Sequence, residues 1–75
     1  MNAETINNRI KQLNAVLNDI EIKPYTISLS DYEVKIQADY DAKVVKRCKQ
    51  LNYSFSFDGN GFIEFKKHCI IITLT

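Results

Sequence analysis

The single histidine, His68, stands beside one of the two cysteines of the chain, and this pair is the first place to look for catalysis. Any Ser–His or Cys–His nucleophile would have to use His68, because the chain holds no other histidine. Neighbouring residues of a strand point to opposite faces, so Cys69 is not placed to form a dyad with it. Cys48 falls in a predicted helix far away in sequence. The sequence therefore predicts no catalytic residues and a protein that is not an enzyme.

Metal and cofactor sites are equally poorly supported by the residue types and their spacing. Zinc sites use ligands in closely spaced pairs, which one histidine and two distant cysteines do not supply. The two glycines, Gly59 and Gly61, provide neither a dinucleotide fingerprint nor a phosphate-binding loop. Four acidic residues along one predicted strand could hold magnesium, but a turn, a helix cap and a solvated sheet face account for them better: Asp31, Glu33, Asp39 and Asp41. We expect no metal, no cofactor and no small-molecule substrate.

Positive charge is concentrated in the C-terminal part of the chain. Residues 1–42 carry a net charge of −3 and residues 43–75 a net charge of +4. A cluster of cations on a helix can neutralise phosphates, and a solvated helix face is the ordinary alternative. The alternative function predicted on this basis is nucleic-acid binding, with contacts from Lys43, Lys46, Arg47, Lys49, Lys66 and Lys67.

The first half of the chain predicts one helix followed by two strands. Apolar residues recur at helical spacing from Ile6 to Ile20, and Asn2 is a suitable N-cap, which predicts a helix over residues 3–19. Strict alternation then predicts strands over 25–29 and 32–40, joined by a turn at residues 30–31 that sets Leu29 opposite Tyr32.

The second half predicts a helix over residues 42–51, capped by Asp41, and then further strands. The Asp-Gly-Asn-Gly sequence at 58–61 predicts a three-residue hairpin loop with a bulge, which pairs Phe57 with Ile63 and Phe55 with Phe65. Parity places most of the aromatic side chains on the inward face, under the helices: Tyr32, Tyr40, Tyr53, Phe55, Phe57 and Phe65. Bases stack on exposed rings, so the predicted inward position of these side chains argues against a surface on which bases stack.

The chain ends in a long apolar run, which predicts a last strand over residues 62–75. Continued alternation would leave an aliphatic row facing outward, where only a partner could cover it. A bulge at residues 66–68 would instead turn the same row into the core. If the row stays outward, it predicts a protein interface made by His68, Ile70, Ile72 and Leu74. The polar sheet face, with Ser28, Lys35, Ser54 and Ser56, offers a second surface.

These elements predict a single α+β domain over residues 1–75, in the order α-β-β-α-β-β. Four mostly antiparallel strands would form the sheet, with both helices on one face. The strand order cannot be read from the sequence; a permuted ferredoxin-like sheet and two αββ units side by side both fit.

Composition and size favour an interaction protein in the cytosol. No apolar stretch approaches the length of a membrane span and no export signal is visible, so both cysteines are expected to be reduced thiols. Ile, Lys and Asn make up 25 of the 75 residues, which suggests an AT-rich gene of a phage or mobile element. The first function predicted is therefore a non-enzymatic protein–protein interaction module that forms a homodimer, and that serves as an accessory or inhibitor protein.

Overall fold

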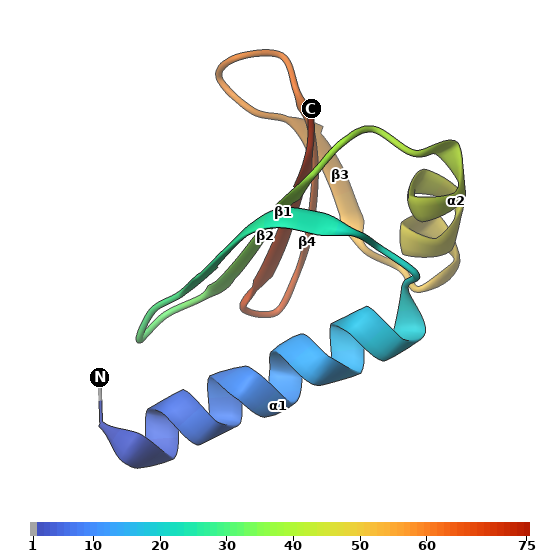
Figure 1. Ribbon diagram of the computed structural model, residues 1–75. Helices are drawn as coiled ribbons and strands as arrows, with labels where there is room; N and C mark the ends of the chain where they lie inside the picture. The colour runs from blue at the N-terminus through green and yellow to red at the C-terminus, as the bar shows by residue number, and fades with distance from the viewer. Residues whose placement is uncertain (1) are drawn as a thin grey trace.

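The computed structural model describes residues 2–75 (Figure 1). Over these residues the element order is α1 (Ala3–Asp19), β1 (Pro24–Leu29), β2 (Val34–Ala38), α2 (Ala42–Gln50), β3 (Ser54–Phe57), β4 (Ile63–Lys67) and β5 (Ile70–Leu74). The strands form one sheet in the order β1-β2-β5-β4-β3. The predicted α+β class is confirmed. Neither helix formed within residues 2–75 combines the length and the apolar composition that crossing a membrane requires.

Helix α1 begins and ends where the sequence predicts. The Asn2 side chain accepts a hydrogen bond from the backbone N–H of Thr5, which satisfies one of the free donors at the helix start. The buried side is centred on Val16 and Ile20, whereas Ile6 and Ile10 remain more than a third exposed. The sheet thus covers the C-terminal half of the helix more fully than its first turns.

The β1–β2 hairpin has the predicted face pattern but a longer turn. Leu29 pairs with Val34, not with Tyr32, and Tyr32 is 85% exposed at the tip of the turn. Ser30 closes the turn, because its hydroxyl accepts hydrogen bonds from the backbone N–H groups of Tyr32 and Glu33. Arg9 of α1 donates to the carbonyl oxygens of Ser30 and residue 31, and so fastens the helix to this turn.

Helix α2 is bounded by the two residues that the sequence indicates. Asp41 caps its N-terminus by accepting from the Lys43 N–H at 2.9 Å. Asn52 follows its end with φ 63°, a left-handed conformation that asparagine tolerates, and the Tyr53 N–H returns to the Cys48 carbonyl. This C-terminal motif turns the chain directly into β3.

The β3–β4 hairpin confirms the predicted loop and register. Phe57 pairs with Ile63 and Phe55 with Phe65. Gly61 adopts φ 83°, the left-handed conformation that the bulge requires. The Asp58 carboxylate accepts from the N–H groups of Asn60 and Phe62, which holds the loop closed.

The prediction of one strand over residues 62–75, and hence of a four-stranded sheet, is wrong. The chain reverses at His68 and Cys69. Strands β4 and β5 therefore form a hairpin with a two-residue loop, in which Lys67 pairs with Ile70. Strand β5 then lies in the middle of the sheet, antiparallel to β4 and parallel to β2. An apolar run in a central strand is expected, because both of its neighbours and the layer above exclude water. The end of the chain is covered by the rest of the same chain.

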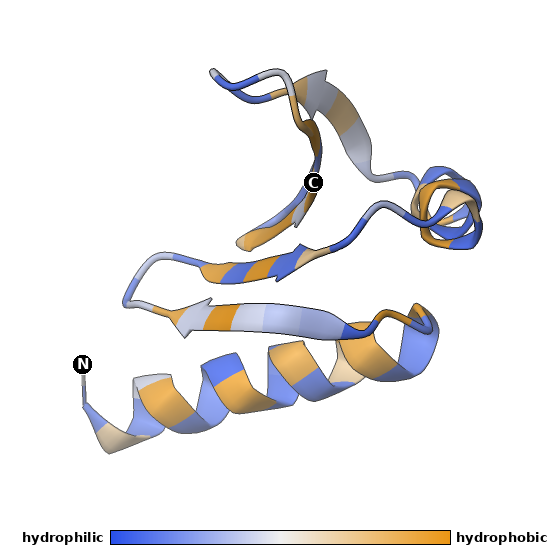
Figure 2. Ribbon diagram, turned by 45° about the horizontal axis from the view of Figure 1, so that its top comes forward, coloured by the Kyte–Doolittle hydropathy of each residue, from blue (hydrophilic) through white to orange (hydrophobic). Residues whose placement is uncertain are grey.

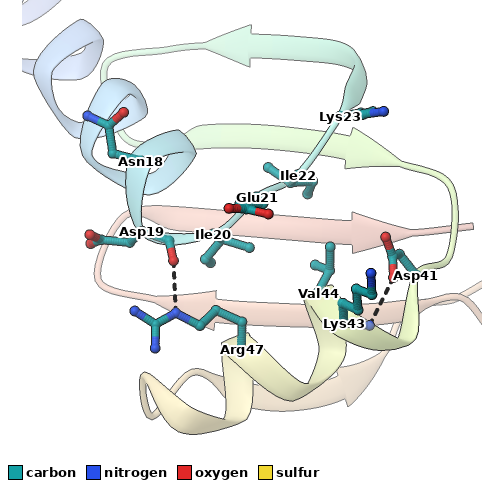
Figure 3. A pocket seen from close by; sticks show the side chains of 10 residues that line it. All are labelled: Asn18, Asp19, Ile20, Glu21, Ile22, Lys23, Asp41, Lys43, Val44 and Arg47. Atoms are coloured by element: carbon teal, nitrogen blue, oxygen red, sulfur yellow. Dashed lines mark hydrogen bonds between the residues drawn. The ribbon is translucent and has the colours of Figure 1, made fainter.

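The core lies between one face of the sheet and both helices (Figures 1 and 3). Alternate residues of β2 are buried in it, and Figure 2 shows the matching alternation of apolar and polar residues along that strand. The buried residues are Val16, Ile20, Ile22, Val34, Ile36, Ala38, Val44, Cys48, Phe65, Ile72 and Leu74. The structure consists of an α1-β1-β2 unit and an α2-β3-β4-β5 unit joined by the parallel β2–β5 pair, so the second unit has one strand more than the arrangement of two αββ units that the sequence allows.

Candidate protein-binding edge

The residues predicted to form an interface do not lie together on the surface. Ile72 and Leu74 are buried in the core, and Ile70 is half-buried against it. His68 is exposed at the β4–β5 turn, where it adopts φ 54°. The outward aliphatic row does not exist, because the hairpin changes which face each residue of the run occupies. This removes the observation on which that interface was predicted.

The six cations predicted to bind nucleic acid are divided among several surfaces. On α2, Arg47 and Lys49 lie on opposite flanks, since residues two apart on a helix are separated by about 200°. Arg47 donates to the Asp19 carbonyl at the end of α1, and Lys67 donates to the Leu51 carbonyl at the end of α2. Lys66 points to the opposite face of the sheet, where it neighbours Ser54 and residue 71. Lys43 and Lys46 remain exposed on the outer side of α2.

The alternation of residues along the strands did not predict the exposure of β3. Phe55 and Phe57 lie on the helix-bearing face, as predicted, but they are 47% and 65% exposed. Phe65, on the next strand, is fully buried. The difference arises because the helix layer does not extend over the outer strand, and a pattern of alternation carries no information about that extent. The prediction that these rings are covered by the helices is therefore wrong.

The exposed rings form an ordered cluster. Phe55 and Phe57 meet edge to face with centroids 5.2 Å apart, and Phe55 meets the buried Phe65 in the same way at 5.5 Å. The Lys49 ammonium lies 5.8 Å from the centre of the Phe55 ring. The cluster is thus anchored to the core on one side and bordered by positive charge on the helix side.

The backbone of β3 also has one free side. Asp58 donates its N–H to the Phe62 carbonyl at 2.8 Å, which makes these two residues a hydrogen-bonded pair. Hydrogen-bonded pairs alternate with non-hydrogen-bonded pairs along an antiparallel ladder. Counting back from Asp58, Ser56 and Ser54 are therefore the residues whose backbone groups bond to β4. It follows that Phe55 and Phe57 direct their N–H and C=O groups away from β4, toward solvent. The same two residues therefore supply both the apolar rings and the backbone groups of this edge.

The two thiols are free, and they differ in burial. Burial raises the pKa of Cys48 to about 11, so its reactive thiolate is strongly disfavoured at neutral pH. Cys69 is half-buried and donates a weak hydrogen bond to the Gln12 side chain. Within residues 2–75, no three His, Cys, Asp or Glu side chains come close enough together to hold a metal ion.

A shallow cleft of about 780 Å³ opens between the end of α1 and α2 (Figure 3). Ile20, Ile22 and Val44 form its floor, and charged side chains of both signs surround it. No polar or charged side chain of the described residues is buried, so none is held inside the cleft away from water. The arrangement provides an open groove with solvated walls.

No protein-family model, curated protein or solved structure matches this chain.

Proposed function

We propose that this protein is a non-enzymatic protein-binding module whose binding site is the free edge of β3. The observation that carries the proposal is the coincidence, at Phe55 and Phe57, of exposed aromatic rings with backbone groups that have no strand beside them. Added strands gain affinity from main-chain hydrogen bonds and specificity from alternate side chains, and both components are available at this edge.

The composition of β3 further supports strand addition. Edge strands are commonly protected from pairing by charged residues, by proline or by a bulge. The sequence Ser-Phe-Ser-Phe contains no charge and no proline, and its pairing with β4 is regular throughout. The opposite edge does carry such protection, since β1 starts at Pro24 and its register shifts between Pro24 and Thr26. We propose a reducing, cytosolic setting for the module, in keeping with its two free thiols.

A photo-crosslinking amino acid at position 57, compared with one at position 32, tests this site. Tyr32 is the more exposed aromatic and lies at the far end of the sheet, so it controls for surface stickiness. We expect one partner to crosslink from position 57. The purified partner should then bind the Phe57→Ser variant at least ~tenfold more weakly than the parent chain. A partner that crosslinks equally from position 32, or binds the variant unchanged, would rule out the β3 edge.

Nucleic-acid binding through α2 stays as a second candidate because one observation favours it. Within residues 2–75, Lys35 forms an ion pair with Glu33, whereas none of the four cations of α2 forms one. One of these cations, Lys49, lies beside an exposed phenylalanine ring on which a base could stack. A double Lys43→Glu, Lys46→Glu variant should then lose binding to a random single-stranded oligonucleotide while keeping its fold. Fluorescence anisotropy at about 50 and 200 mM salt measures this, because phosphate contacts weaken by orders of magnitude over that range. Absence of binding at the lower salt would remove this candidate.

A further inference from the structure

We infer that the occupant of the β3 edge is a second copy of this chain, paired antiparallel to the first through β3 about a two-fold axis at Ser56. The inference rests on the proposed function and names the partner for the same edge. It is supported by the hydrogen-bond register of β3 and by the distribution of side chains on its two faces, while the area and charge of the contact set how tight the pairing can be.

The register follows from the backbone groups that are free. Pairing Phe55 of one copy with Phe57 of the other lets each such pair exchange both backbone hydrogen bonds, because these are the residues whose N–H and C=O groups point outward. Ser56 then faces Ser56 of the second copy as a pair without backbone hydrogen bonds, which is what alternation requires. Phe55, Ser56 and Phe57 pair with one another across the axis, Ser54 of each copy comes opposite Asp58 of the other, and the two sheets become one continuous sheet.

The side chains match across this axis. In an antiparallel pair, directly opposed residues share a face, so the phenylalanines of both copies meet on the helix-bearing face and the serines meet on the open face. The result is a four-ring cluster over the new ladder, which buries the rings that one copy leaves exposed. A two-fold contact of this kind is self-complementary and closes on itself.

Area and charge predict a weak dimer. Half-exposed phenylalanines contribute on the order of 100 Å² each, which places the contact below the roughly 1,200 Å² of standard interfaces and among transient ones. Lys49 of each copy borders the ring cluster, so two like charges approach one another across it. Added salt screens that repulsion, and the dimer should become tighter as ionic strength rises. Binding of nucleic acid would show the opposite dependence.

The β1 edge is a poorer acceptor for β3. Pro24 has no N–H, and the irregular pairing at Tyr25 interrupts the row of free backbone groups. A β3-to-β1 contact would also leave one edge free on each end and would grow into open chains. A closed dimer through β3 uses only the unprotected edge.

Sedimentation equilibrium of the full chain, from about 10 μM to 1 mM, with two variants and two matched controls, tests the inference. Ser56→Lys places two lysines directly opposite each other in the dimer, while within one copy the new lysine faces Glu64 and preserves the fold. Thr26→Lys makes the same change on β1, opposite Gln37. Phe57→Ser removes two rings from each dimer, and Tyr32→Ser removes an exposed aromatic elsewhere.

We expect a reversible monomer–dimer equilibrium that is weakened at least ~tenfold by Ser56→Lys and on the order of 100-fold by Phe57→Ser, with both controls unchanged. Circular dichroism and melting of each variant separate loss of pairing from loss of fold. A chain that stays monomeric to ~1 mM would overturn the second copy as occupant, yet the β3 edge itself would stand if a crosslinked partner still depends on Phe57. A dimer insensitive to both β3 variants, or open polymers sensitive to Thr26→Lys, would also overturn it.

Discussion

Replacing Ile72 with aspartate should unfold the protein. Ile72 lies in the central strand β5, between Ile36 of β2 and Phe65 of β4, and its side chain is fully buried. The substitution removes a large apolar side chain and buries a carboxylate that has no cation within the core. Changes of this kind cost more than about 4 kcal/mol, which is comparable to the whole stability of a domain this small.

Ile71→Asp is the matched control, because it makes the same change in the same strand on the opposite face. Ile71 is only partly buried and is flanked on that face by Lys35 and Lys66, which can pair with the new carboxylate. We expect this variant to stay folded, with its stability changed by about 1 kcal/mol or less. Far-ultraviolet circular dichroism and urea denaturation distinguish the two. Equal tolerance of both substitutions would contradict the central position of β5.

Alkaline pH should destabilise the protein through Cys48. Burial raises the pKa of this thiol from 9.0 to about 11, so between these values the unfolded chain has lost the proton while the folded protein still holds it. Stability is therefore fully present below pH 9, falls as the pH rises toward 11, and levels off above it. A difference of this size corresponds to about 2–3 kcal/mol. The pKa of Tyr53 is also raised, chiefly by burial, which acts in the same direction.

Urea denaturation at several values between pH 8 and 11 measures this loss. Cys48→Ala is the control, because it removes the titrating thiol; it lowers the stability at pH 8 but should flatten the pH dependence. Tyr53→Phe should remove the smaller remaining part. If the Cys48→Ala variant lost stability between pH 9 and 11 as steeply as the parent chain, burial of this thiol would not be the cause.

Local signals in the sequence predicted most of the elements and one register correctly. Asn2 and Asp41 mark helix starts, Asn52 marks a helix end, and the glycine pair in the β3–β4 loop sets the pairing of Phe57 with Ile63. Each of these depends on interactions within a few residues of the signal. That is why they can be read without knowing the rest of the fold.

The β4–β5 turn was missed because its residues carry no turn signal. Two-residue hairpin loops favour glycine or asparagine at positions with positive φ, whereas this loop is formed by His68 and Cys69. His68 adopts a left-handed conformation because β5 is held between β2 and β4, and that long-range pairing overrides the local preference. Because the turn was missed, the predicted interface included Ile72 and Leu74, which the structure buries in the core.

The candidate site could be predicted only in part. The alternation of β3 correctly assigned Phe55 and Phe57 to the helix-bearing face. Their exposure depends on where α2 lies relative to the outer strand, and the order of the strands decides which strand is outer. Neither property has a signature within the segment itself.

Amide hydrogen exchange, measured by NMR at low and high protein concentration, shows directly whether the β3 edge takes up the β3 strand of a second copy. The amides of Ser54 and Ser56 should be protected at both concentrations, because they are bonded to β4. The amides of Phe55 and Phe57 should exchange rapidly in the dilute sample and become protected in the concentrated one, and those of β1 should not change. Equally fast exchange of the Phe55 and Phe57 amides at both concentrations, or new protection on β1, would contradict pairing of two copies through β3.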